Sequence, residues 1–231
     1  MDKKDTSKLL TSFMYAGVVS AILVLIHLAL VVTGTSPGIF GIVPREVEGL
    51  TGILTAPWIH GDWSHLLSNL GPIFVLLSAM LYFYRKASLK ALVWMYFMTG
   101  IWVWIAARHN SHIGASGMVY ALAFYLFFSG VIRRDTRSIA VSLVIAFFYG
   151  SLVWGVLPTQ EGVSWESHLF GGVAGIALAW FTRKIGVIQR KKYSWQDEPD
   201  YAPDDDRAVW NYRKNWQGSN QMYVPQDRFK D

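Results

Sequence analysis

The chain has 231 residues and a net charge of +5; 52% of its residues are hydrophobic and only 16% are charged. Soluble domains average about 25% charged residues, so this composition argues against a soluble protein. The absence of cysteine excludes disulfides and thiolate metal sites. Basic residues cluster at the ends of apolar runs, which indicates membrane topology and no nucleic-acid partner.

Six apolar stretches are long enough, or nearly so, to cross a bilayer as helices of ~20 residues. In chain order they are 12–32, 65–84, 91–107, 113–132, 139–157 and 165–181. None contains lysine, arginine or aspartate, and Glu166 lies at the edge of the last one. Most of the links between them are short. We therefore predict an all-α membrane protein, in which six transmembrane helices form a bundle with antiparallel neighbours.

Lysine and arginine predict the orientation of this bundle. Of the sixteen lysine and arginine residues between positions 3 and 192, fourteen lie before the first span, in alternate links or after the last span. Only Arg45 and Arg108 lie in the other links. We therefore expect both termini in the cytoplasm. No stretch resembles a cleavable signal peptide, and together with the basic cytoplasmic side this favours a bacterial inner membrane.

The composition divides the chain into three parts. Residues 1–11 are predicted to form a cytoplasmic N-terminal segment, and 12–185 the membrane domain. Residues 186–231 are polar, with acidic blocks and few aliphatic side chains, which predicts a disordered cytoplasmic tail. Aromatic residues recur in the tail, so a docking segment is the alternative. Segment 33–64 is rich in glycine and proline yet moderately apolar, which fits an interfacial or partly re-entrant loop.

Spans two, four and six all begin on the non-cytoplasmic side, and each begins with polar residues. The sequence HLLSN occupies 65–69, GASG occupies 114–117, and SHLFG occupies 167–171. Each polar group therefore lies within a turn or two of the same membrane face. Ionisable groups within a span are costly to insert, so these residues are candidates for function.

Ser116 and His168 are the candidate pair for nucleophilic chemistry. A serine hydroxyl is a weak nucleophile until a base accepts its proton, and His168 is the best candidate base. No aspartate or glutamate lies well inside a span, so we expect a Ser–His dyad without a supporting acid. Gly171 and Gly175 are spaced to allow the close helix approach that such a hydrogen bond needs.

Further groups are predicted to support this pair. His65 and Asn69 are spaced i,i+4 on one helix face, where both can donate N–H groups to an oxyanion. The backbone near Ser116 offers another donor, because N–H groups at a helix start lack intrahelical partners. Gly114 flanks the serine. Tyr120 follows it by four residues on the same face, where its ring could pack on the imidazole of the base.

Each of these residues also has a simpler, structural interpretation. A serine among glycines in a membrane helix most often packs or forms hydrogen bonds. A histidine at a span edge is often an interfacial hydrogen-bonding group. His65 with Asn69 could form an ordinary interhelical clamp. His27 is interpreted as structural, and no role is assigned to the remaining histidines, which are His60, His109 and His112.

Other chemistries fit the sequence less well. The nucleophile-elbow pattern G-x-S-x-G is absent around Ser116, because the second glycine comes one residue early. The zinc-protease pattern H-E-x-x-H is absent too, and the histidines show no regular ligand spacing, so no metal or cofactor is expected. Transporters often contain paired or broken repeats, and the sequence has no such repeat.

These motifs resemble, in their order and on alternate spans, the rhomboid family of intramembrane serine proteases. The resemblance runs from about residue 41 to 184 and rests on HLLSN at 65–69, GASG at 114–117, Tyr120, and HLFGGVAG at 168–175. It implies a six-transmembrane-helix rhomboid-like bundle with Ser116 as nucleophile and His168 as general base. It also implies His65, Asn69 and the Ser116 backbone N–H around the oxyanion, with segment 33–64 partly in the membrane beside the site.

Two features depart from the family pattern. Many members carry a Trp-Arg pair in the first loop, which this chain lacks, and Ser167 stands where alanine or glycine is common. The expected function is an intramembrane serine endopeptidase, with the lipid bilayer as its environment and transmembrane proteins of one span as substrates. The alternatives are a rhomboid-like pseudoprotease that binds membrane proteins without cutting them and, in another class, a small-solute transporter.

Overall fold

The computed structural model describes residues 2–158 and 162–186, and this part of the chain is helical, without β-strands. Its long helices are α1 (Lys3–Thr33), α3 (Trp63–Phe83), α4 (Arg85–Ala106), α5 (Ser116–Arg133), α6 (Thr136–Tyr149) and α7 (Trp165–Phe181). Between α1 and α3 lie η1 (Pro37–Phe40), η2 (Glu48–Leu50), α2 (Gly52–Thr55) and η3 (Ala56–Trp58), and a 3-10 segment, η4 (Gly150–Val156), continues α6. The predicted all-α membrane fold is confirmed. The predicted tail, 186–231, lies outside the described residues except for its first.

Five of the described helices are long and apolar enough to cross a membrane, and one of these is formed by α6 together with η4. The sixth, α7, has 17 residues and occupies the predicted range, at the lower end of the ~17–25 residues needed for a span. α1 begins at Lys3, well before the predicted start of the first span at residue 12. The helix therefore continues through most of the N-terminal segment.

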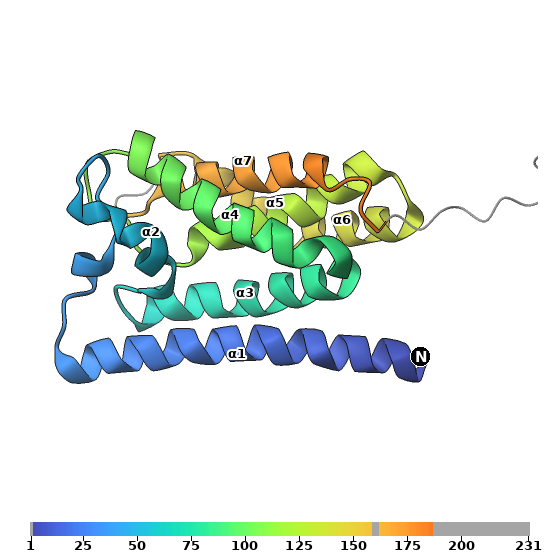
Figure 1. The fold of residues 1–231 in the computed structure, drawn as a ribbon, viewed down its shortest axis with the longest axis horizontal. Coiled ribbons are helices and arrows are strands. Elements are labelled where there is room, and N and C mark those ends of the chain that lie inside the picture. Colours follow the sequence, from blue (N-terminus) through green and yellow to red (C-terminus); the bar gives the residue numbers. More distant parts are fainter. Residues whose placement is uncertain (1, 159–161, 187–231) are drawn as a thin grey trace, which may run out of the picture. The chain divides into compact units, whose positions relative to one another are not determined.

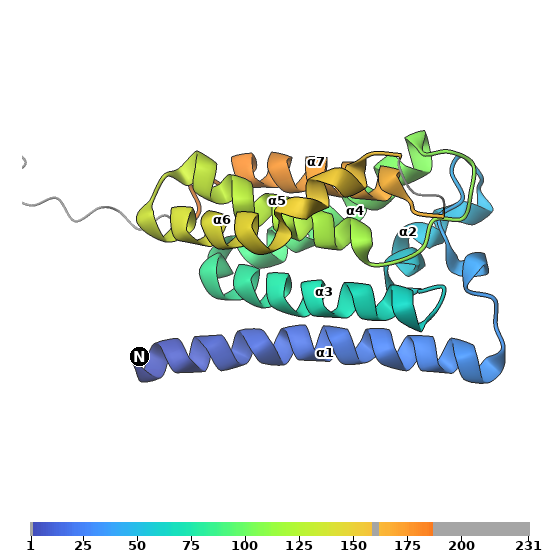
Figure 2. The same cartoon turned by 180° about the vertical axis from the view of Figure 1, so that it is seen from behind.

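α5 lies at the centre of the bundle, in contact with α3, α4, α6 and α7 (Figures 1 and 2). α1 packs along α3 on one side, and α7 packs on α5 and α4 on the other. Tyr125 and Leu126 of α5 are fully buried in the core. Large apolar side chains elsewhere point outward, and Phe147 of α6 is 82% exposed. An apolar exterior around a packed core suits contact with lipid.

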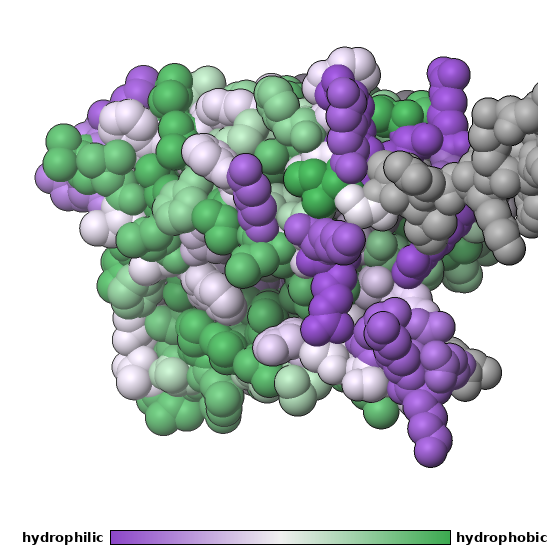
Figure 3. Space-filling model, turned by 45° about the vertical axis from the view of Figure 1, so that its right-hand side comes forward, coloured by the Kyte–Doolittle hydropathy of each residue, from purple (hydrophilic) through white to green (hydrophobic). Residues whose placement is uncertain are grey.

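The basic side chains gather at one end of the bundle, where Figure 3 shows a group of hydrophilic residues. They are Lys3, Lys4 and Lys8 of α1, Arg85, Lys86 and Lys90 of α4, Arg133, Arg134 and Arg137 at the α5–α6 turn, and Arg183 and Lys184 after α7. Arg45 and Arg108 lie at the opposite end, with the loop that joins α1 to α3. The basic residues that alternate links carry in the sequence therefore lie together at one end of the folded bundle.

The loop between α1 and α3 is fastened to the end of α4. Nη1 of Arg45 donates a hydrogen bond to the carbonyl oxygen of Ala107 at 2.8 Å. Nε1 of Trp104 donates to the carbonyl oxygen of Glu46 at 2.9 Å. These two contacts hold the loop against the end of α4.

Glycines allow α7 to approach α5 closely. A Cβ atom on Gly171 would overlap the carbonyl oxygen of Gly117, and one on Gly175 would overlap that of Ala121. Any larger residue at either position would force the two helices apart. The glycine pair that the sequence suggested for close helix approach thus lies at the contact between α5 and α7.

Replacing Gly175 with alanine is expected to lower the free energy of unfolding by about 1–3 kcal/mol, because the added methyl group meets backbone atoms of α5. Gly71→Ala is the matched control. It faces open space on α3, so its substitution should be neutral or stabilise by up to about 1 kcal/mol. Denaturant unfolding of the detergent-solubilised protein measures both changes. Equal stability of the two variants would contradict the close packing of α5 and α7.

Candidate active site

The first turns of α5 and α7 bring Ser116 and His168 together. Oγ of Ser116 lies 2.9 Å from Nε2 of His168, which is within hydrogen-bond range. The imidazole is largely buried, with 8% of the residue exposed. Both helices begin at the end of the bundle that holds few basic residues, so the pair lies near that end.

The second ring nitrogen of His168 determines which tautomer is present. Nδ1 lies 2.8 Å from the carbonyl oxygen of Gly155, an atom that can only accept, so Nδ1 carries the ring proton. Nε2 of the neutral ring is therefore free to accept the hydroxyl proton of Ser116. The Gly155 carbonyl, on η4, thus stands where a carboxylate stands in a Ser-His-Asp triad.

Tyr120 packs flat on the imidazole of His168. The two ring centroids are 4.1 Å apart, and the planes differ by 6°. Tyr120 follows Ser116 by one turn of α5, as the sequence spacing suggested. A Cβ on Gly155 would overlap the tyrosine hydroxyl, so η4 also lies against this ring. The imidazole is therefore held across its face by Tyr120 and at its edge by the Gly155 carbonyl.

His65 lies against the backbone that leads into Ser116. A Cβ on Gly114 would be 2.6 Å from Nε2 of His65. Gly114 also has a φ of +111°, a conformation that side chains rarely adopt, so two independent constraints require glycine here. Nδ2 of Asn69 donates to the carbonyl oxygen of His65 at 2.8 Å. This bond uses one of the two amide hydrogens of Asn69 and leaves the other for a further acceptor.

The loop between α1 and α3 holds the backbone on the other side. The N–H of Gly114 donates to the carbonyl oxygen of Ala56 at 2.9 Å, and the N–H of Ala115 donates to Nε2 of His60 at 3.3 Å. Burial, reinforced by the neighbouring His65, lowers the pKa of His60 to about 4, so its ring is neutral and Nε2 can accept. This loop therefore lies directly beside the residues that precede Ser116.

Sequence reasoning missed two groups that contact the site. His60 was assigned no role, although it lies five residues before His65, in the polar stretch that precedes α3. That nearness is the signal that could have marked it. Gly155 gave no signal at all, because it acts through a backbone carbonyl that every residue possesses.

The other histidines lie apart from the dyad. His27 is buried against the ring of Trp63, with centroids 4.6 Å apart, in a contact that fits its structural interpretation. His109 lies at the surface, where Nε2 is 3.1 Å from a carboxylate oxygen of Glu46. Over 2–158 and 162–186, no three histidine, aspartate or glutamate side chains gather where they could hold a metal ion.

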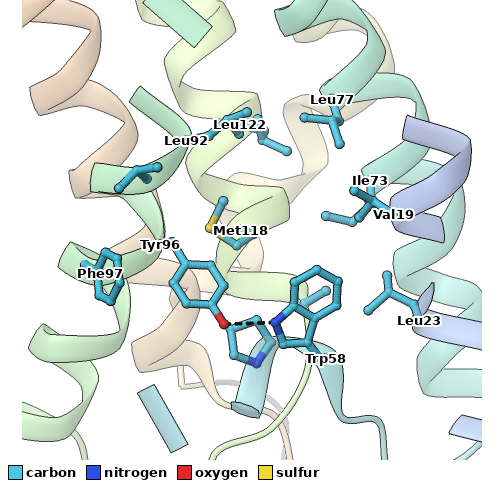
Figure 4. A pocket seen from close by; sticks show the side chains of 13 residues that line it. Val19, Leu23, Trp58, Ile73, Leu77, Leu92, Tyr96, Phe97, Met118 and Leu122 are labelled. Carbon is cyan, nitrogen blue, oxygen red and sulfur yellow. Dashed lines mark hydrogen bonds between the residues drawn. The ribbon is translucent and has the colours of Figure 1, made fainter. Parts of the chain in front are cut away.

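An apolar cavity of about 370 Å³ lies between α1, α3, α4 and α5 (Figure 4). Its polar groups are satisfied: Nε1 of Trp58 donates to the Tyr96 hydroxyl at 3.0 Å, and that hydroxyl donates to the carbonyl oxygen of Leu54. Ala115 and Met118, on either side of Ser116 in the chain, form part of its wall. The cavity therefore suits apolar groups and reaches the helix that carries the serine.

Comparison with known proteins identifies the family of this chain. A sequence profile of the Rhomboid domain matches residues 47–185. Uncharacterized proteins of Mycobacterium bovis and Mycobacterium tuberculosis are each 33% identical over 187 residues, covering 74% of this chain and 76% of theirs. An uncharacterized protein of Mycobacterium leprae is 34% identical over 175 residues, covering 71% of this chain and 67% of its own. The profile covers α3 to α7 and with them the Ser116–His168 pair, and the chain belongs to the rhomboid family.

Proposed function

We propose that this protein is an intramembrane serine endopeptidase that cleaves single-span membrane proteins near the non-cytoplasmic face of the bilayer. Serine proteolysis within the membrane is the typical activity of the rhomboid family. The observation that carries the proposal is the 2.9 Å contact between Ser116 Oγ and His168 Nε2, in the tautomer that can accept the serine proton.

In the proposed reaction, Oγ of Ser116 attacks the carbonyl carbon of the scissile peptide bond while its proton passes to Nε2 of His168. The imidazolium that forms donates from Nδ1 to the Gly155 carbonyl. Nε2 then returns the proton to the leaving amine as the C–N bond breaks, which leaves an ester on Ser116. Water, deprotonated in turn by His168, hydrolyses that ester and restores both side chains.

The oxyanion of each tetrahedral intermediate needs nearby donors. We assign this role to the His65 imidazole, the second amide hydrogen of Asn69 and the backbone N–H of Ser116. The N–H groups of Gly114 and Ala115 are already committed to the α1–α3 loop. Ser116 is the first residue of α5, where a backbone N–H has no intrahelical partner.

The geometry of the site also bears on the substrate. A peptide bond inside a stable helix is shielded by its own hydrogen bonds, so the cleaved segment must unwind before Ser116 can reach it. Small or helix-breaking residues near the scissile bond make unwinding easier. The dyad lies near the end of the bundle, where water can enter from outside the lipid. Transmembrane segments that carry such residues near that face are therefore the proposed substrates.

The detergent-solubilised protein is expected to react covalently with a fluorophosphonate probe. Ser116→Ala should abolish labelling, and His168→Ala should slow it by about 100-fold or more, because the hydroxyl then lacks its base. Gel fluorescence measures the rate. Labelling that survives both substitutions would end the dyad proposal. No labelling of the unaltered protein would favour the non-catalytic binder or the transporter.

Asn69→Ala is expected to reduce the cleavage rate of a single-span substrate by about 100–1,000-fold, the loss typical of one missing oxyanion donor. Ser68→Ala, at the preceding position on α3, is the control and should cleave normally, because its hydroxyl donates to the carbonyl oxygen of His65. The assay follows product formation in proteoliposomes. A normal rate for Asn69→Ala would remove this side chain from the proposed site.

We also propose that both termini are cytoplasmic and that the membrane is a bacterial inner membrane. Because the chain lacks cysteine, single cysteines can report on each side. In intact cells, a membrane-impermeant maleimide should label Ser111→Cys, on the loop before α5, and leave Ser7→Cys, near the start of α1, unlabelled. The reverse pattern would show that the orientation is inverted.

A further inference from the structure

Glu166 is a buried carboxylate close to the dyad that the proposed reaction does not use. It belongs to the first turn of α7, two residues before His168, and only 3% of the residue is exposed. Within 2–158 and 162–186, it is the one acidic residue that is buried. Its Oε1 lies 3.0 Å from Nε of Arg108, which follows the end of α4, and accepts the Arg108 backbone N–H at 3.4 Å.

Arg108 holds the chain at two points around the start of α7. While its Nε pairs with Glu166, its Nη2 donates to the carbonyl oxygen of Val163 at 2.6 Å. One guanidinium therefore fixes both ends of the short segment from Val163 to Glu166. The planar guanidinium presents its donors in a rigid fork, so the two contacts set the direction in which α7 begins.

A second set of hydrogen bonds joins the same two segments. Nε2 of His112 lies 2.9 Å from the carbonyl oxygen of Arg108, so Nε2 carries the proton and Nδ1 accepts from the Ser164 hydroxyl at 2.6 Å. Oγ of Ser164 also lies 2.7 Å from Oγ of Ser167. The residues from Arg108 to His112 are thus bound side by side to the turn that opens α7.

This bound pair of segments connects the two halves of the dyad. The chain from Arg108 to His112 runs on through Gly114 to Ser116, while the turn that holds Glu166 runs on to His168. Ser116 and His168 therefore follow, in the chain, the two segments that these contacts hold together. A shift of α7 relative to the segment from Arg108 to His112 would change the distance between Oγ of Ser116 and Nε2 of His168.

We infer that Glu166, through its ion pair with Arg108, is a positioning residue that holds the first turn of α7 so that His168 stays in register with Ser116; this inference rests on the proposed proteolytic function. The Glu166 side chain is 4% exposed and that of Arg108 is 49% exposed, so only the carboxylate has lost its hydration. A buried carboxylate without its partner is costly, and the pair therefore restricts the geometry at its site. Oε2 of Glu166 has no hydrogen-bond partner, so the carboxylate depends on Arg108 for compensation.

The test uses Glu166→Gln, Arg108→Gln and the variant that carries both substitutions. Glu46→Gln is the control. Glutamine keeps the size of the glutamate side chain and removes its charge. Glu46 is the matched control, because it pairs with His109 at the same end of the molecule but is half exposed and away from α7. Two quantities are measured: the fluorophosphonate labelling rate of Ser116, and the hydrogen exchange of amides between residues 163 and 170.

Glu166→Gln and Arg108→Gln are each expected to slow labelling by about 10-fold or more, since small misplacements of reacting groups have large effects on rate. Both should speed hydrogen exchange at the start of α7, and Glu46→Gln should change neither quantity. The losses in the double variant should not add, because the two residues act as one unit. In proteoliposomes, Glu166→Gln should lower kcat while KM is retained, which a general loss of folded protein would not produce.

An unchanged exchange rate or an unchanged labelling rate in Glu166→Gln overturns the inference. Additive losses in the double variant also overturn it, because the two residues would then act separately. If the unaltered protein is not labelled, the proteolytic function fails. The exchange data alone then decide whether the ion pair fixes α7, and faster exchange in Glu166→Gln but not in Glu46→Gln supports that part of the inference.

Discussion

The close approach of α5 and α7 is the constraint on which the rest of the site depends. A hydroxyl and an imidazole on two separate helices can share a proton only if the helices hold them about 3 Å apart, so the helices must pack closely in a fixed register. Gly171 and Gly175 permit this, because any Cβ at these positions would overlap carbonyl oxygens of α5. With the helices this close, Ser116 and His168 meet at hydrogen-bond distance.

Hydrogen bonds of backbone groups orient His168 and the residues that precede Ser116. The carbonyl of Gly155 accepts the Nδ1 proton of His168, and the loop between α1 and α3 accepts the N–H groups of Gly114 and Ala115. Unpaired backbone groups are expensive in a membrane, so each such contact also removes a cost of burial. The same bonds that keep the chain satisfied in lipid thereby orient the residues of the candidate site.

The last part of α6 illustrates how tertiary context changes a predicted element. The sequence predicted one continuous span over 139–157, and α6 together with η4 is long and apolar enough to form it. The α-helix nevertheless ends at Tyr149, and the chain continues as a tighter 3-10 segment through two glycines. Such 3-10 segments are frequent at the ends of α-helices. Here it brings the Gly155 carbonyl to the edge of the imidazole.

The sequence by itself determined the helical class, the approximate spans, the grouping of charges and the choice of Ser116, His168, His65, Asn69, Gly114 and Tyr120 as candidates. Hydropathy and side-chain chemistry are local properties, so they can be read from a single chain. Only the tertiary structure decided the partner of Nδ1, the role of His60 and the burial of Glu166 against Arg108. Those contacts join residues 13 to 58 positions apart, mostly through backbone atoms or loops, and no local pattern encodes them.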